Sequence, residues 1–101
     1  MHHILKGIME IKDNELLRQF EIITETGLVA IEYSIQERKL FLTKFCNNNN
    51  EDEELHTEFI KNVLEIAEER KLKVVPTHSK FISFFRKNRR FQEMLPPGIK
   101  I

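Results

Sequence analysis

The order of apolar and polar positions divides the chain into two halves. β-favouring runs fill the first half at residues 18–23, 28–35 and 39–45, with polar breaks at Glu25-Thr26-Gly27 and Gln36-Glu37-Arg38. Because the connections between these runs are short, we expect three strands in an antiparallel meander. The asparagine run at residues 47–50 is typical of a loop.

The second half opens with a change of period. Between residues 51 and 71, Leu55, Phe59, Val63 and Ile66 recur three or four positions apart, with charged residues between them. This spacing predicts a long amphipathic helix. Asn50 is placed to cap it, and Glu53 is placed to complete a capping box.

The remaining residues predict one more strand and one more helix. The run at 73–75 is typical of a buried strand that Pro76 stops, and this strand should lie parallel to the third one. Ser79 is placed to cap a second helix, which a short turn at 91–95 follows. The predicted order is βββαβα, an α+β fold with a mixed sheet, one long and one shorter helix, and a single domain over residues 1–101.

Composition narrows the setting of this domain. Of 101 residues, 41% are hydrophobic and 32% are charged, which suits one core beneath a well-solvated surface. The single cysteine, Cys46, has no partner for an internal disulfide, and no zinc-finger spacing occurs. No run approaches the roughly 18 apolar residues of a membrane helix, so we expect a cytoplasmic protein without membrane contact.

Charge is balanced overall but unevenly distributed. Residues 51–70 carry eight acids against two bases, and residues 71–101 carry eight bases against one acid. The acids suit the dipole of a helix start, whereas a cation site would need set spacings and a glycine turn, so we expect no metal. The basic run of the last third either ends a helix in solvent or contacts phosphates. It consists of Arg86, Lys87, Arg89 and Arg90.

Several side chains have both a structural and a chemical interpretation. Cys46 is expected to be a buried or half-buried structural thiol, because no nearby group lowers its pKa. His56 is expected on the polar side of the long helix, in solvent like the other histidines, while a catalytic role stays open for His78. The phenylalanines after residue 80 have helical spacing, which favours core packing over base stacking; they are Phe81, Phe84, Phe85 and Phe91.

Three short stretches carry a family resemblance. They are Glu10-Ile11-Lys12-Asp13-Asn14 ahead of the first run, Ala30-Ile31-Glu32-Tyr33 in the second, and Leu72-Lys73-Val74-Val75-Pro76 ahead of the last helix. In this order they resemble the minimal single-domain GNAT-like N-acetyltransferases over about residues 9–95. The resemblance implies the acyl-CoA N-acyltransferase fold, acetyl-CoA as cofactor and an amine as acceptor.

The resemblance also implies a cofactor site, from which this chain departs. In the family an Arg-Gly-x-Gly turn opens the long helix, whose first amides hold the cofactor pyrophosphate. A gap-free placement puts that turn on Glu51-Asp52-Glu53-Glu54, where glycine is absent and four carboxylates repel a diphosphate. The backbone amides of Glu53, Glu54 and Leu55 remain as candidates to bind acetyl-CoA.

The catalytic positions that the resemblance implies are also replaced. The family's His-Thr pair falls on Thr43-Lys44, and its Pro-x-Cys falls on Pro76-Thr77-His78. An imidazole suits general-base chemistry near neutral pH, so His78 is the candidate catalytic residue, although it cannot form a thioester. We therefore expect an acetyltransferase-related domain with impaired or lost acyl transfer. The alternative is a non-catalytic module that binds a protein or nucleic acid through the basic run.

Overall fold

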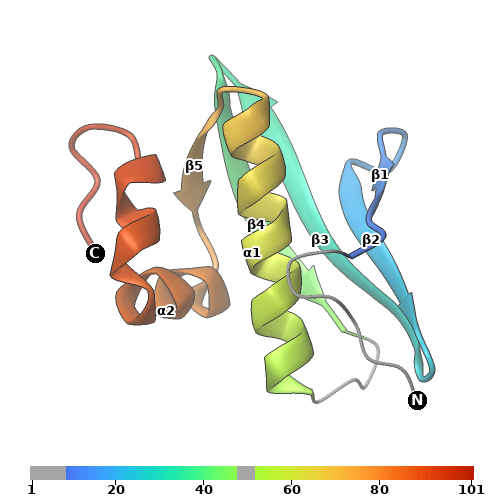
Figure 1. Ribbon diagram of the computed structural model, residues 1–101. Helices are drawn as coiled ribbons and strands as arrows, with labels where there is room; N and C mark the ends of the chain where they lie inside the picture. Colours follow the sequence, from blue (N-terminus) through green and yellow to red (C-terminus); the bar gives the residue numbers. More distant parts are fainter. Residues whose placement is uncertain (1–8, 48–51) are drawn as a thin grey trace.

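One five-stranded sheet organises the protein; the long helix comes before its last strand in the chain, and the other two helices come after that strand (Figure 1). The computed structural model describes residues 9–47 and 52–101. The strands are β1 (Lys12–Asn14), β2 (Gln19–Thr24), β3 (Gly27–Gln36), β4 (Lys39–Cys46) and β5 (Lys73–Pro76). The helices are α1 (Glu53–Glu69), α2 (Ser79–Lys87) and the 3₁₀ helix η1 (Arg89–Met94).

The strands lie side by side in chain order, from β1 to β5. β1 to β4 are antiparallel, and β5 pairs with β4 in parallel, which confirms the predicted α+β fold with a mixed sheet. β1 is an additional strand that we did not expect from the sequence. Its three residues are polar and too few to show an alternating pattern, so only their pairing with β2 identifies them as a strand.

Tight turns connect the antiparallel strands. Gly27 follows the turn after β2 with a φ of 126°, a value that glycine adopts without strain. Glu37 and Arg38 form the turn after β3, with φ values of 53° and 64°. Positive φ at both central residues fits the mirror-image turns that match strand twist, so β3 and β4 form a close hairpin.

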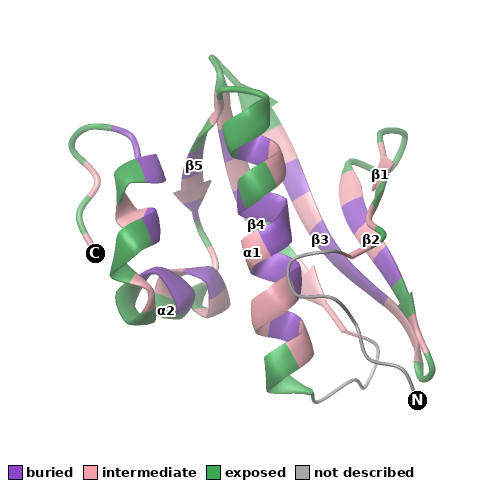
Figure 2. Cartoon of the chain, viewed as in Figure 1, coloured by how far each residue is buried: buried purple, intermediate pink, exposed green. Residues whose placement is uncertain are grey.

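α1 lies on one face of the sheet, and buried and exposed residues alternate along it (Figure 2). The buried residues form one mainly apolar face of the helix. The N-cap is Asp52, whose Oδ1 accepts a hydrogen bond from the Leu55 amide at 3.1 Å. The predicted cap, Asn50, lies outside the described residues. The capping role belongs to Asp52 because its short carboxylate reaches the third helical amide.

The C-terminal third folds back beside β5. α2 begins at Ser79, but its cap is His78 rather than the predicted Ser79, because the His78 ring nitrogen Nδ1 accepts the Lys80 amide proton at 3.1 Å. The expected core role of the phenylalanines is confirmed; Phe81, Phe84, Phe85 and Phe91 are all buried. Among the described residues, no helix is both long and apolar enough to span a membrane.

Candidate functional site

The site that the sequence predicts lies where β4 and β5 separate. Their pairing ends at Leu42 opposite Pro76, and the Thr77 amide makes one further hydrogen bond to the Leu42 carbonyl. Beyond this point β4 continues to Cys46, whereas the segment after β5 turns away and enters α2. A wedge therefore opens between the end of β4, the start of α1 and the start of α2.

The start of α1 forms one side of this wedge. The Leu55 amide, one of the three predicted cofactor contacts, already donates to Asp52. The Glu53 carboxylate lies 3.4 Å from Nζ of Lys80, a residue of α2, and Glu54 is exposed to solvent. The predicted amide contacts therefore lie at a helix end where Asp52 already caps one amide and Lys80 already pairs with Glu53.

Aromatic rings fill the wedge. The Phe45 ring at the end of β4 lies 4.8 Å from the His56 ring and 6.0 Å from the Phe81 ring, measured between centroids. Nζ of Lys80 lies 4.9 Å from the centroid of Phe45, in a cation–π geometry. One ring thus links β4 to both helices.

His56 overturns the expectation of a solvated side chain, because only 1% of its surface is exposed. It follows the same spacing as Phe59, Ile60 and Val63, all of which are buried on one face of α1. That spacing was visible in the sequence and should have placed His56 on the inner face. Polarity alone suggested the wrong side of the helix.

His78 lies at the edge of the same cluster, with its ring 6.0 Å from Phe81. Since Nδ1 accepts the Lys80 amide proton, a neutral His78 ring carries its own proton on Nε2. The nitrogen lone pair that would accept a substrate proton is therefore used in the cap. The catalytic role of His78 stays a prediction.

A small pocket of about 150 Å³ lies between α1 and α2 in this region. Its polar lining combines Glu53 and Thr57 of α1 with Lys80, Ser83 and Lys87 of α2. Sites for drug-sized ligands usually measure about 300–1,000 Å³. The pocket is thus smaller than a site for a whole coenzyme.

A solved structure shares this arrangement of elements. It is the NMR solution structure of a "GCN5-like putative N-acetyltransferase" from Staphylococcus aureus, with a TM-score of 0.69 and 21% sequence identity. The match covers 91% of this chain and 91% of that chain. This protein has a GNAT-like fold. No family model and no curated protein sequence matches the chain.

Cys46, at the end of β4 in the GNAT-like fold, is half-buried, as expected. Its Sγ lies 3.8 Å from a carboxylate oxygen of Glu32 on the neighbouring strand. Burial raises the pKa of the Cys46 thiol, and the Glu32 charge raises it further. The thiol therefore holds its proton and is a poor nucleophile at neutral pH.

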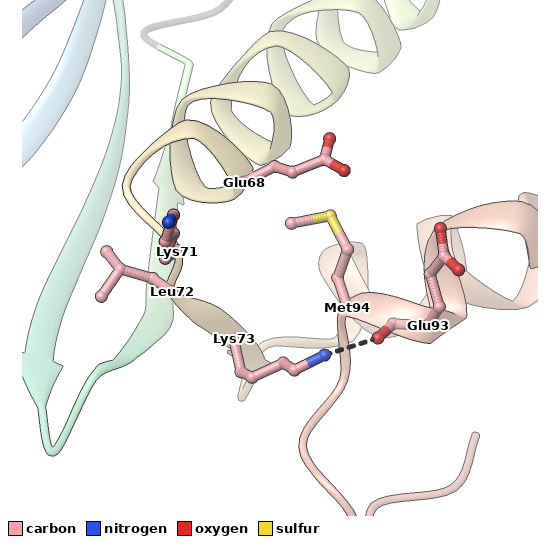
Figure 3. A pocket seen from close by; sticks show the side chains of 6 residues that line it. All are labelled: Glu68, Lys71, Leu72, Lys73, Glu93 and Met94. Carbon is pink, nitrogen blue, oxygen red and sulfur yellow. Dashed lines mark hydrogen bonds between the residues drawn. The ribbon is translucent and has the colours of Figure 1, made fainter.

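A second, larger groove lies at the opposite end of α1, and Figure 3 shows the side chains around it. This groove has a volume of about 460 Å³ and carries both signs of charge, from Glu68, Lys71, Lys73 and Glu93. Nζ of Lys73 donates to the Glu93 carbonyl at 3.0 Å and so ties the start of β5 to η1. Because acidic and basic side chains both line this groove, its charge favours neither an anionic nor a cationic ligand.

The basic run lies on α2 and η1. Arg86, Lys87, Arg89 and Arg90 are exposed, and within residues 9–47 and 52–101 none of the four forms an ion pair. Arg90 stacks over the Phe91 ring at 4.6 Å and lines a neighbouring groove together with Glu65 and Glu68. The described residues contain no group of three His, Cys, Asp or Glu side chains that could hold a metal ion.

Proposed function

We propose that the chain is one GNAT-like domain over residues 1–101, with its core at about 9–95, in which acetyl-CoA-dependent acyl transfer to an amine is impaired or lost. The fold supports the relationship to acetyltransferases. The filled wedge supports the loss, because Phe45 contacts rings of both helices where β4 and β5 separate. The lone cysteine supports a reducing, cytoplasmic setting.

The charges at the start of α1 also support a loss of acetyl-CoA binding. A helix start attracts phosphate through bare amides and the positive end of its dipole. Here the Asp52 carboxylate accepts the Leu55 amide proton, and Glu53 and Glu54 add two more charges in the first turn. A diphosphate would have to displace the cap and approach three carboxylates.

A titration with acetyl-CoA and with CoA, followed by thermal unfolding and by amide NMR shifts, tests the proposal. We expect no rise in melting temperature with ligand up to about 1 mM, because a ligand that does not bind the native state cannot stabilise it. Saturable shifts of amides in the first turn of α1, with thiol release from acetyl-CoA in the presence of amines at about 1 s⁻¹ or faster, as in ordinary enzymes, would overturn it.

Variants separate the two obstacles to the cofactor. Phe45→Ala removes the ring, and Glu53→Gln with Glu54→Gln removes two charges at the same helix end. If the ring is the obstacle, only the first variant gains CoA binding; if charge is the obstacle, only the second does. Glu65→Gln and Glu68→Gln at the other end of α1 provide the matched control for charge.

A second candidate is a non-catalytic module that binds a nucleic acid or an acidic protein through the basic run. Four exposed cations without ion pairs among the described residues favour it, since phosphates would complete their interactions. The test is the salt dependence of oligonucleotide binding. For duplex DNA, the logarithm of the binding constant should fall with the logarithm of salt concentration at a slope of about −0.9 per contacted phosphate. Loss of this dependence when Arg86, Lys87, Arg89 and Arg90 become Gln would support the module. The absence of binding at low salt would leave only protein partners.

A further inference from the structure

The two edges of the sheet differ. β5 forms one edge, and α2 and η1 lie beside it (Figure 1). β1 forms the other edge, and no described strand pairs with its outer side. An open edge presents backbone N–H and C=O groups that can pair with another strand, and native proteins usually protect such an edge.

Apolar side chains are exposed next to the open edge. The described residues include four large apolar side chains that are exposed, and three of them, Leu16, Leu17 and Ile23, belong to the β1–β2 hairpin. Ile23 is 81% exposed and borders a hollow of about 540 Å³ beside β1. Leu16 and Leu17 lie in the turn between the two strands, so Ile23 is the exposed apolar side chain beside the edge itself.

The charges at this edge can pair with the same charges on a second copy of the chain. Glu10 and Lys12 are both exposed and flank Ile11, and all three line the hollow. β1 begins at Lys12, so Glu10 and Ile11 directly precede it. When β1, extended back through Glu10, pairs antiparallel with its own copy about Ile11, each Glu10 stands opposite the other copy's Lys12. A single register thus brings two pairs of opposite charges together.

We propose that a second copy of this chain binds at the β1 edge by antiparallel strand pairing about a two-fold axis at Ile11. Because side chains alternate between faces, Lys12 lies between its own Glu21, its neighbour on β2, and Glu10 of the partner subunit. Ile11 meets Ile11 of the partner subunit on the opposite face. The two sheets become one continuous sheet across the axis.

The affinity should be modest. Opposite-charge pairs across strands contribute about 0.2–1 kcal/mol each, and a contact between two short strands is smaller than the roughly 1,200–2,000 Å² of stable interfaces. We therefore expect a dimer that forms with a dissociation constant between about 1 μM and 1 mM. Sedimentation equilibrium over a concentration series measures it directly.

Charge reversal tests the register. Glu10→Lys and Lys12→Glu each place like charges opposite each other in a homodimer, and each should weaken association by about tenfold. A mixture of the two variants restores both opposite-charge pairs and should form a heterodimer at wild-type strength. Lys100→Glu, an exposed charge reversal far along the chain, is the control and should leave association unchanged.

Cross-linking provides a test that keeps the fold intact if Lys12→Glu disturbs Glu21. In a Cys46→Ser background, Glu10→Cys with Lys12→Cys should form disulfides between two copies under oxidising conditions. A wild-type protein that stays monomeric at about 1 mM overturns the proposal. Dimers that survive both single charge reversals, or variants that fail to associate when mixed, also overturn it.

Discussion

The phenol oxygen of Tyr33 in β3 donates a 2.5 Å hydrogen bond to Oδ1 of Asp13 in the edge strand β1. The other carboxylate oxygen, Oδ2, lies 2.9 Å from a guanidinium nitrogen of Arg70, the residue that caps the end of α1. Burial and the hydrogen bond to Asp13 raise the pKa of Tyr33 to about 12. One carboxylate therefore joins the edge strand to the centre of the sheet and to the long helix.

The contact between Tyr33 and Asp13 makes the free energy of unfolding depend on pH in the alkaline range. The folded protein holds the Tyr33 proton more tightly than the unfolded chain, so the contribution is complete below pH 10.0 and is lost as pH rises to about 12. Tyr33→Phe should lower stability at neutral pH by about 1–3 kcal/mol and flatten the alkaline slope. Urea unfolding at a series of pH values measures both effects.

The chain contains only one tyrosine, so ultraviolet absorbance of tyrosinate reports Tyr33 alone. A titration of the folded protein with its midpoint at the ordinary pKa of 10.0 would contradict the assignment. Lysines lose charge in the same pH range, and the Tyr33→Phe protein corrects for them.

The phenylalanines of the aromatic cluster should contribute unequally to the free energy of unfolding. Phe81 is fully buried, whereas Phe45 is half-buried. We expect Phe81→Ala to cost about 3–5 kcal/mol of unfolding free energy, as truncation of a core aromatic does, and Phe45→Ala to cost clearly less. Chemical denaturation compares them. Equal losses would mean that the wedge around Phe45 is as closely packed as the core.

The chain leaves α1 through a lysine in a left-handed conformation. Lys71 has a φ of 61°, and the following Leu72 amide donates to the Ala67 carbonyl at 2.9 Å, which closes the helix end. Glycine adopts this φ without the steric cost of a Cβ, so Lys71→Gly should stabilise the protein by about 0.5–1 kcal/mol. Lys71→Ala removes the same side chain but keeps the Cβ. A gain as large with alanine would attribute the effect to charge.

Cys46 offers a kinetic test of local electrostatics. Glu32 raises the pKa of this thiol and Lys44 lowers it. Because only the thiolate reacts, Glu32→Gln should speed alkylation of the single cysteine at neutral pH, and Lys44→Met should slow it. Alkylation rates measured over a pH series separate the effect of the thiolate fraction of Cys46 from the effect of its accessibility to the reagent. Two variants with unchanged rates would show that access controls the reaction.

Local patterns were enough to predict most of the scaffold. The spacing of apolar residues predicted β2, β3, β4, α1 and the buried phenylalanines of the last third, because this spacing depends only on residues within one element. It did not predict β1. The parallel β5 followed from chain connectivity. His56 was recoverable as well, since it shares the spacing of Phe59 and Val63, and the error came from judging it by polarity.

The candidate site was harder to predict because its parts come from different elements. The sequence alone determined that carboxylates stand at the start of α1 and that an imidazole stands at position 78. Only the tertiary structure decided that His78 caps α2, that Lys80 crosses to Glu53 and that Phe45 lies between two helices. Local spacing fixes which face of an element is apolar, but contacts between distant residues exist only once the sheet has brought those elements together.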